Sequence, residues 1–425
     1  MRAANYAACL VAVLLSTGAR AQSRLLLADA QTEARAHAPE GAELAARVRA
    51  AEIARAAAGR IFRVNPTISG TVVPGTITGH PDELSWDVGV QQTFDVSGSW
   101  GPRRASADAA WGRAGFQRDD GLRALDEAVA VTVADLANAQ RHVRRAERIA
   151  KLQEVAAHAA HTQLQVGQGN QLDVDGADLD LAATRADAAR ARGELTEARA
   201  RLARLLGREV IGDLSVDDPV DTPAPETDAN VAALVERDPR VRAADAELRS
   251  ARFELATFKR MAWPTLTLGT SFGYRRRDIP AGSLTGAPIA NQLTANWTDT
   301  ELGFSLSLPL PLFDRKQTER AQATGRILAA EAAVRSVRAD VRQQLAASWA
   351  ELQATTDALR ELSSTPEIVD REFGLLDKAM QAGALDAVAR AFAIRRLQEA
   401  AIRFDTAVRD LRVARAHWAR RSTGL

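Results

Sequence analysis

The stretch from Glu301 to Asp314, ELGFSLSLPLPLFD, decides the fold class. From Leu302 to Leu310 every second residue is Leu or Phe, and the residues between them, as far as Ser307, are Gly or Ser. Successive side chains of an extended chain point to opposite sides, so this stretch has one apolar face and one small polar face. That pattern is typical of a strand in an outer-membrane β-barrel.

The same alternation occurs in two other places, and Ile68 and Val72 indicate a weaker first strand. Four strands are therefore predicted at about 66–74, 84–96, 265–275 and 301–312. Each is long enough to cross hydrocarbon when tilted. A soluble β-sandwich with inward apolar faces is the alternative, and the long helical insertion between the two hairpins disfavours it. Four strands cannot close a barrel alone, and open strand edges are not tolerated in hydrocarbon, so the strands require oligomerisation.

The order of segments occurs twice along the chain, which indicates an internal repeat. Each half has a helix, two strands and a long helical hairpin. The first repeat is predicted over 22–229 and the second over 230–425, with helical hairpins over 101–207 and 314–421 and a connecting loop over 208–229. Heptad-like apolar spacing inside the hairpins favours antiparallel coiled-coil packing.

Helix lengths suggest how the segments stack. The return helix 171–207 is much shorter than the preceding helix 103–166. We therefore expect the helix 230–262 to continue the first return helix, and the helix 28–62 to continue the second return helix, 385–421.

The N-terminus has the pattern of a secretory signal peptide. A basic start is followed by an apolar stretch from Cys9 to Leu15 and by Ala19-Arg20-Ala21, an A-x-A cleavage pattern. We predict a signal peptide over residues 1–21 with cleavage after Ala21. Lipidation of Cys9 is an alternative, as is an apolar N-terminal helix of a cytosolic protein.

Composition excludes several classes of protein. The net charge of +1 gives no case for nucleic-acid binding. The one Cys of the chain excludes a disulfide framework and a Cys-rich metal site. We find no nucleophile–base pair and no phosphate-binding loop, so we expect neither enzymatic activity nor a cofactor. Hydrophobic residues make up 46% of the chain, but aromatic residues only 5%, which favours closely packed helices over a bulky core.

The turns of the two helical hairpins contain Gly167, Gly169, Asn170 and Leu172 in the first hairpin, and Gly383 and Leu385 in the second. Taken alone, these residues are consistent with plain helix–helix turns in which the glycines serve only the backbone. Glu154, His158 and His161 share one helix face, but three ligands on one straight helix rarely converge on a metal ion.

These features together resemble the outer membrane factor (TolC-like) efflux family. The resemblance rests on the ordered set: signal peptide, duplicated halves, the segment LPLPLFD from Leu308 to Asp314, and the tip Gly383-Ala384-Leu385-Asp386. The segment from Ser307 to Asp314 looks most like the heavy-metal (CzcC-like) branch. The first tip, Gly169 to Asp173, is one residue longer than the pattern.

The resemblance implies a mainly α-helical fold with a small β part, in which three copies build one 12-stranded transmembrane barrel and a helical tunnel. It implies a passive homotrimeric duct in the outer membrane lipid, extending into the periplasm of a Gram-negative bacterium. Partners would be a periplasmic adaptor (membrane fusion protein) and an inner-membrane pump of the RND type. The resemblance also implies that the adaptor contacts the two hairpin turns, at Gly167, Gly169, Asn170, Leu172, Gly383 and Leu385. Substrates would be small solutes, with heavy-metal cations among the candidates. A soluble periplasmic coiled-coil adaptor or scaffold remains an alternative, and an outer component of type I protein secretion would share the fold.

Acidic residues near the tips would then be repeated around a threefold axis. The candidate pore-entrance residues are Asp173, Asp175, Asp377 and Asp386. A ring of carboxylates gathers cations and disfavours anions. Placement near a helix N-terminus, where a carboxylate complements the helix dipole, is the alternative for Asp173 and Asp386.

Overall fold

The computed structural model describes residues 24–60, 64–74, 84–209, 215–216, 231–280, 294–381 and 387–422. The predicted signal peptide with its cleavage site Ala21, most of the loop 208–229 and the second hairpin turn lie outside these residues. The chain divides into two units. The helical unit comprises Met1–Ala46, Gln117–Val241 and Arg338–Leu425, and the strand unit comprises Arg47–Phe116 and Arg242–Val337.

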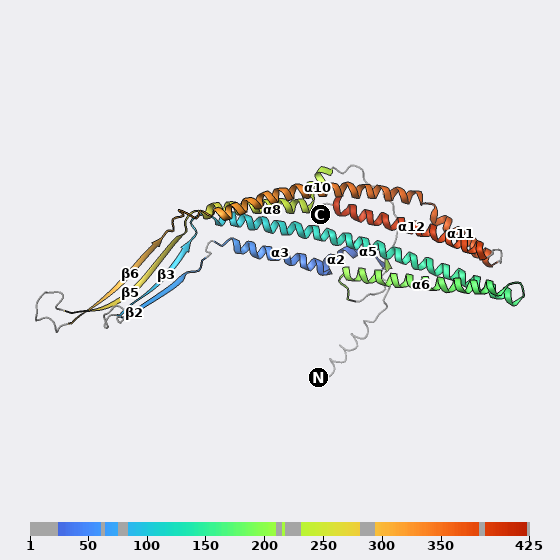
Figure 1. Ribbon diagram of the computed structural model, residues 1–425, viewed down its shortest axis with the longest axis horizontal. Coiled ribbons are helices and arrows are strands. Elements are labelled where there is room, and N and C mark those ends of the chain that lie inside the picture. Colours follow the sequence, from blue (N-terminus) through green and yellow to red (C-terminus); the bar gives the residue numbers. More distant parts are fainter. Residues whose placement is uncertain are drawn as a thin grey trace, which may run out of the picture. The chain divides into compact units, whose positions relative to one another are not determined.

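The strand unit contains one four-stranded antiparallel sheet, shown in Figure 1. Its strands are β2 (Thr67–Pro74), β3 (Leu84–Phe94), β5 (Leu266–Pro280) and β6 (Thr294–Ser307), in the order β2-β3-β5-β6. The prediction of four strands is therefore confirmed. β3 from the first half of the sequence pairs with β5 from the second half, so both repeats contribute strands to the sheet.

The β5–β6 hairpin is longer than the sequence suggests. Its ladder continues from Thr267 paired with Ser307 to Pro280 paired with Thr294, well past the expected strand end at 275. The alternation stops at Arg275, but backbone pairing with β6 does not depend on it. At the other end β6 stops at Ser307, because Pro309 and Pro311 lack the backbone N–H that a ladder needs.

Two proline residues divide helices that were expected to be continuous. In the first half α2 (Leu27–His37) ends and α3 (Pro39–Ala58) begins at Pro39. In the second half α7 (Val231–Arg237) is followed by α8 (Pro239–Met261) in the same way. A proline disfavours helical backbone at the residue before it and fits the first position of a new helix, so each proline sets a break.

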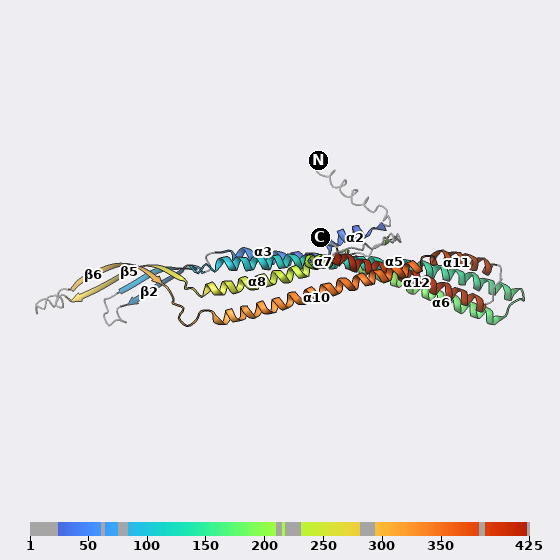
Figure 2. The same cartoon turned by 90° about the horizontal axis from the view of Figure 1, so that it is seen from above.

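The long helices are α5 (Trp100–Gln165), α6 (Gln171–Leu205), α10 (Gln317–Glu361), α11 (Thr365–Gln381) and α12 (Ala387–Ser422). In the helical unit α5 and α6 form one hairpin, and α11 and α12 pack beside them, as Figure 2 shows. None of the described helices is both long and apolar enough to cross a membrane.

Clusters of buried apolar residues hold the helical unit together. One cluster joins α2, α5, α6 and the short parallel pair β1 (Arg24–Leu25) and β4 (Ser215–Val216). A second joins α5, α11 and α12 through residues that include Ile149, Leu152, Phe373, Met380 and Leu397. Alanines of α2 and α6, among them Ala34 and Ala203, let these helices approach closely in the first cluster.

The helix that meets the end of α6 is α2, which corrects the expectation that the helix 230–262 continues it. Gly207 follows α6 with φ +68°, and a Cβ at this position would lie 2.3 Å from the backbone oxygen of His37. Arg208 also pairs with Glu33 of α2, with an Nε–Oε1 distance of 2.6 Å. Helix length alone could not show which of the segments 28–62 and 230–262 meets α6, because the two segments have similar lengths. The contacts of Gly207 and Arg208 identify the neighbour as α2.

Candidate functional site

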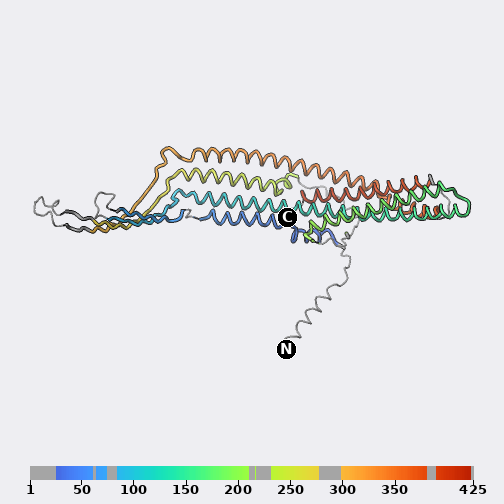
Figure 3. The backbone as a smooth tube through the Cα atoms, turned by 60° about the horizontal axis from the view of Figure 1, so that its bottom comes forward, coloured from blue at the N-terminus to red at the C-terminus, as the bar shows by residue number. Residues whose placement is uncertain are grey.

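The turn between α5 and α6 is built by local hydrogen bonds. Figure 3 shows the chain reversing there. Gly167 has φ +75°, and the bonds from Gly167 N to Leu164 O (3.1 Å) and from Gln168 N to Gln163 O (2.9 Å) form a Schellman motif. Asn170 then caps α6, since its side chain accepts a hydrogen bond from Asp173 N at 2.8 Å.

The two glycines of this turn have different roles. Only Gly167 has the left-handed backbone that favours glycine. Gly169 is needed for space, because a Cβ there would lie 3.1 Å from the backbone nitrogen of Leu164. The turn therefore presents a rigid backbone, with large apolar side chains beside it: Leu172 is 79% exposed and Leu179 is 72% exposed.

The acidic residues near this turn have different surroundings. Asp173 and Asp175 are exposed, and Asp175 accepts a hydrogen bond from Gln171 of the same helix at 2.8 Å. Asp178 instead contacts His161 of α5 at 3.1 Å, across the hairpin. Asp377 is half-buried on α11. Gly383, Leu385 and Asp386 lie outside the described residues, so the structure gives no geometry for the second turn.

The structure does not assemble the metal site considered on α5. Glu154 pairs with Arg185 of α6 at 2.9 Å, and His161 pairs with Asp178. Among the residues that the structure describes, no group of three His, Cys, Asp or Glu side chains is placed to hold a metal ion.

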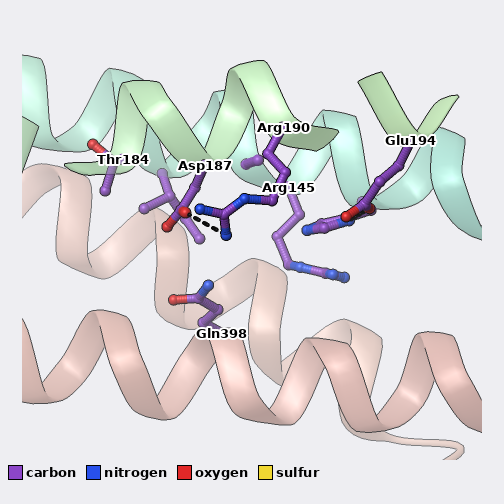
Figure 4. A pocket seen from close by; sticks show the side chains of 9 residues that line it. Arg145, Thr184, Asp187, Arg190, Glu194 and Gln398 are labelled. Atoms are coloured by element: carbon purple, nitrogen blue, oxygen red, sulfur yellow. Dashed lines mark hydrogen bonds and ion pairs between the residues drawn. The ribbon is translucent and has the colours of Figure 1, made fainter. Parts of the chain in front are cut away.

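A small pocket of about 200 Å³ lies between α5, α6 and α12 (Figure 4). Its charged groups already have partners. Arg190 and Asp187 are 3.3 Å apart, and His142 Nδ1 is 3.0 Å from Glu194. Arg145 pairs with Asp405 of α12. The pocket is therefore better described as an ionic contact between helices than as a ligand site.

The buried ionic contact of the helical unit consists of Arg141, Arg145 and Asp405. Their side chains are 13%, 11% and 12% exposed. Arg141 Nε lies 2.9 Å from Asp405 Oδ1, and Arg141 Nη2 donates a hydrogen bond to the backbone oxygen of Asp405 at 3.4 Å. Burial lowers the pKa of Arg141, and Asp405 partly offsets this effect. No sequence signal indicated this contact, because Asp405 is 264 residues from Arg141 and 260 residues from Arg145.

The sheet of the strand unit has two distinct faces. On one face the cross-strand pairs put large apolar residues side by side, among them Phe272 opposite Leu302 and Leu268 opposite Leu306. These side chains are exposed, with Phe304 at 81% and Leu306 at 69%. A contiguous exposed apolar surface of this kind marks contact with a partner or a membrane.

The other face of the sheet is lined by small residues. A Cβ at Gly269 would lie 2.4 Å from Ser305 Oγ, and a Cβ at Gly303 would lie 2.6 Å from Ser271 Oγ. Glycine and serine thus interlock across β5 and β6. The alternation predicted from the sequence is present in the sheet, with Phe272, Leu302, Phe304 and Leu306 on one side.

The family is established by sequence. The model of the family described as outer membrane efflux protein matches residues 30–208 and 231–422. The chain therefore belongs to the outer membrane efflux protein family. This membership confirms the predicted family, its outer-membrane location and its role in efflux, and the two matched segments agree with the internal repeat. The heavy-metal branch stays a prediction. No curated protein sequence matches the chain.

Solved structures support the fold. CusC gives a TM-score of 0.74 at 16% identity, covering 94% of this chain and 92% of that chain. The outer membrane protein VceC from Vibrio cholerae gives 0.70 at 17% identity, covering 94% and 96%. The open state of the MtrE outer membrane channel from Neisseria gonorrhoeae gives 0.66 at 19% identity, covering 93% and 90%. At these sequence identities, the similarity to the three structures shows that the chain shares their fold.

Proposed function

We propose that this chain is the passive outer-membrane duct of a tripartite efflux system and that it acts as a homotrimer. The observation that carries the proposal is the four-stranded sheet with an exposed apolar face and two edge strands, β2 and β6. In hydrocarbon, the free backbone groups of these edges need partners. Three copies related by a threefold axis would pair β2 of one copy with β6 of the next and close a 12-stranded barrel.

The proposed duct does not supply the energy for transport. An inner-membrane pump, for which we propose the RND type, supplies the energy, and a periplasmic adaptor connects the two. The turn between α5 and α6 is the proposed adaptor contact, with Gly167, Gly169 and Asn170 fixing the backbone and Leu172 supplying apolar area. Gly383 and Leu385 are proposed to do the same in the second turn.

We propose that acidic residues at the turns make the entrance cation-selective. The residues are Asp173, Asp175, Asp377 and Asp386. In a trimer each inward-facing carboxylate becomes a ring of three charges, which raises the local cation concentration. This supports small cationic solutes, including heavy-metal ions, as substrates.

The selectivity prediction can be checked in planar bilayers. The variant Asp173→Asn, Asp175→Asn, Asp386→Asn is expected to lose cation selectivity, so its reversal potential in a salt gradient moves toward zero. Asp357→Asn is the matched control, because Asp357 is an exposed α10 residue that pairs with Arg360 at 2.6 Å. An unchanged reversal potential in the triple variant would contradict the ring.

The transport role is tested by deletion in the native host. We expect the deletion strain to become more sensitive to at least one member of a panel covering Zn²⁺, Co²⁺, Cd²⁺, Ni²⁺, Cu⁺ and organic drugs, and the plasmid-borne gene to restore growth. Profiles of secreted polypeptides are compared in parallel. Loss of a secreted polypeptide with unchanged resistance would overturn the efflux role in favour of type I protein secretion. Recovery of the protein as a soluble periplasmic monomer would overturn the duct altogether.

A further inference from the structure

The helical unit contains a second, larger cavity of about 580 Å³. It lies among α2, α5, α12 and β4, away from both hairpin turns in the sequence. Its volume is in the range typical of small-molecule sites, roughly 300–1,000 Å³. Charged side chains from three helices line it: Arg35, Arg123, Asp126, Glu127, Arg412, Arg415 and Arg420.

The two carboxylates in this cavity are already engaged. Asp126 accepts a hydrogen bond from Arg35 Nε at 2.9 Å. Glu127 accepts one from Arg420 Nη1 at 2.5 Å and lies 3.7 Å from His417. The charges of these two acids are thus matched by Arg35 and Arg420. The other charged residues of the lining are Arg123, Arg412 and Arg415.

Arg123 is the unusual member of this group. It is only 8% exposed, and its Nε is buried without a hydrogen-bond partner among the described residues. Buried polar groups in folded proteins are nearly always hydrogen-bonded, and leaving a charged donor unsatisfied is costly. Arg123 is also one of the residues that line the cavity, so an acceptor bound there would meet its side chain.

The surroundings of Arg412 also favour an anion. Burial, together with the neighbouring charges of Arg141 and Arg415, lowers the pKa of Arg412 to about 10. Crowded guanidinium groups repel one another, and a negative charge between them would offset that repulsion.

The remaining lining of the cavity is aliphatic. Leu26 and Leu27 at the start of α2 are 53% and 42% exposed, and Ala130, Val133 and Val216 complete this side. A purely inorganic anion would leave this apolar surface in contact with water. The cavity therefore combines one cationic side with one aliphatic side.

We propose that this cavity binds an amphipathic monoanion of the alkyl carboxylate class. The carboxylate would accept hydrogen bonds from the Arg123 guanidinium, a geometry that suits its planar donors. The alkyl chain would cover Leu26, Leu27 and Val216. The inference uses the helical unit alone, so it does not depend on the proposed duct.

Calorimetric titration of decanoate into the full chain, held in amphipol without free detergent, tests the proposal. We expect decanoate to bind at least about tenfold more tightly than decanol or decyltrimethylammonium, since hydrogen bonds between charged groups are stronger than those of a neutral hydroxyl and an ammonium group is repelled by the arginines. Arg123→Gln is expected to weaken decanoate binding by at least about tenfold. Arg395→Gln, which removes an 82% exposed arginine from α12, is expected to leave the affinity unchanged.

Two further variants separate ligand binding from a structural role. Arg123→Gln without ligand is expected to melt at the same or a higher temperature than the native chain, because it removes the buried donor Nε, which has no hydrogen-bond partner among the described residues. The variant is also expected to lose the decanoate-induced rise in melting temperature. A structural arginine would instead lower the melting temperature. Ala130→Phe fills the cavity without changing its charge and is expected to block decanoate binding.

Several results would overturn the proposal. Equal affinities for decanoate and decanol would show that the arginines do not contribute to binding. An unchanged decanoate affinity in Arg123→Gln would show that Arg123 does not contact the ligand. Absence of decanoate binding, together with a weakened oligomer in Arg123→Gln, would show that a neighbouring copy of the chain fills the cavity. Efflux measured separately in the native host would be unaffected by any of these results.

Discussion

Phe304→Arg is expected to remove most of the protein from the outer membrane. Phe304 is 81% exposed on the apolar face of β6, opposite Thr270 of β5. An arginine on the lipid face of a barrel costs about 2–4 kcal/mol at the bilayer midplane. In a trimer the cost is incurred in every copy, so the total is roughly three times larger. The measurement is the amount of protein in outer-membrane fractions and its oligomeric state in mild detergent.

Glu301→Arg is the matched control for this variant. It introduces the same residue into the same strand, but at a position on the polar face with Gly303. We expect normal membrane insertion, with any change confined to conductance. If Phe304→Arg inserted as well as Glu301→Arg, the apolar face would not be the lipid face and the proposed duct would have to be abandoned.

Asp405→Ala is expected to lower the free energy of unfolding of the helical unit by about 3–5 kcal/mol. The substitution leaves Arg141 and Arg145 buried between α5 and α12 without their carboxylate. An uncompensated buried charge costs far more than the same charge at the surface, because the interior cannot solvate it. The measurement is the loss of helical circular dichroism with temperature or denaturant.

Two variants calibrate this result. Glu399→Ala removes the partner of Arg395, whose side chain is 82% exposed, and we expect a loss of about 0.5 kcal/mol or less. Replacing all three buried residues, with Arg141→Met, Arg145→Met and Asp405→Leu, is expected to restore most of the stability, since well-packed apolar residues often match a buried ion pair. If Asp405→Ala unfolded like the native chain, the contact would contribute nothing to stability.

The boundaries of the elements show where local signals suffice and where they fail. The breaks at Pro39 and Pro239 could have been predicted, because proline constrains the residue before it wherever it occurs. The extension of β5 past Arg275 could not, because it depends on pairing with β6 and not on the alternation of its own side chains. The helix that meets α6 could not be predicted either, since helix length does not identify a neighbour.

The sequence by itself determined the four alternating strands, the helical hairpins and the turn at Gly167 to Asn170, since strand alternation, helical periodicity and capping are encoded by residues close together in the chain. Only the tertiary structure decided that Asp405 meets Arg141 and Arg145, that Gly207 contacts His37 and that Arg123 is buried in a cavity. These facts depend on how each helix is rotated about its axis against helices far away in sequence. A periodic pattern gives the apolar face of a helix, but the packing of several helices determines which charged residue at the border of that face becomes enclosed.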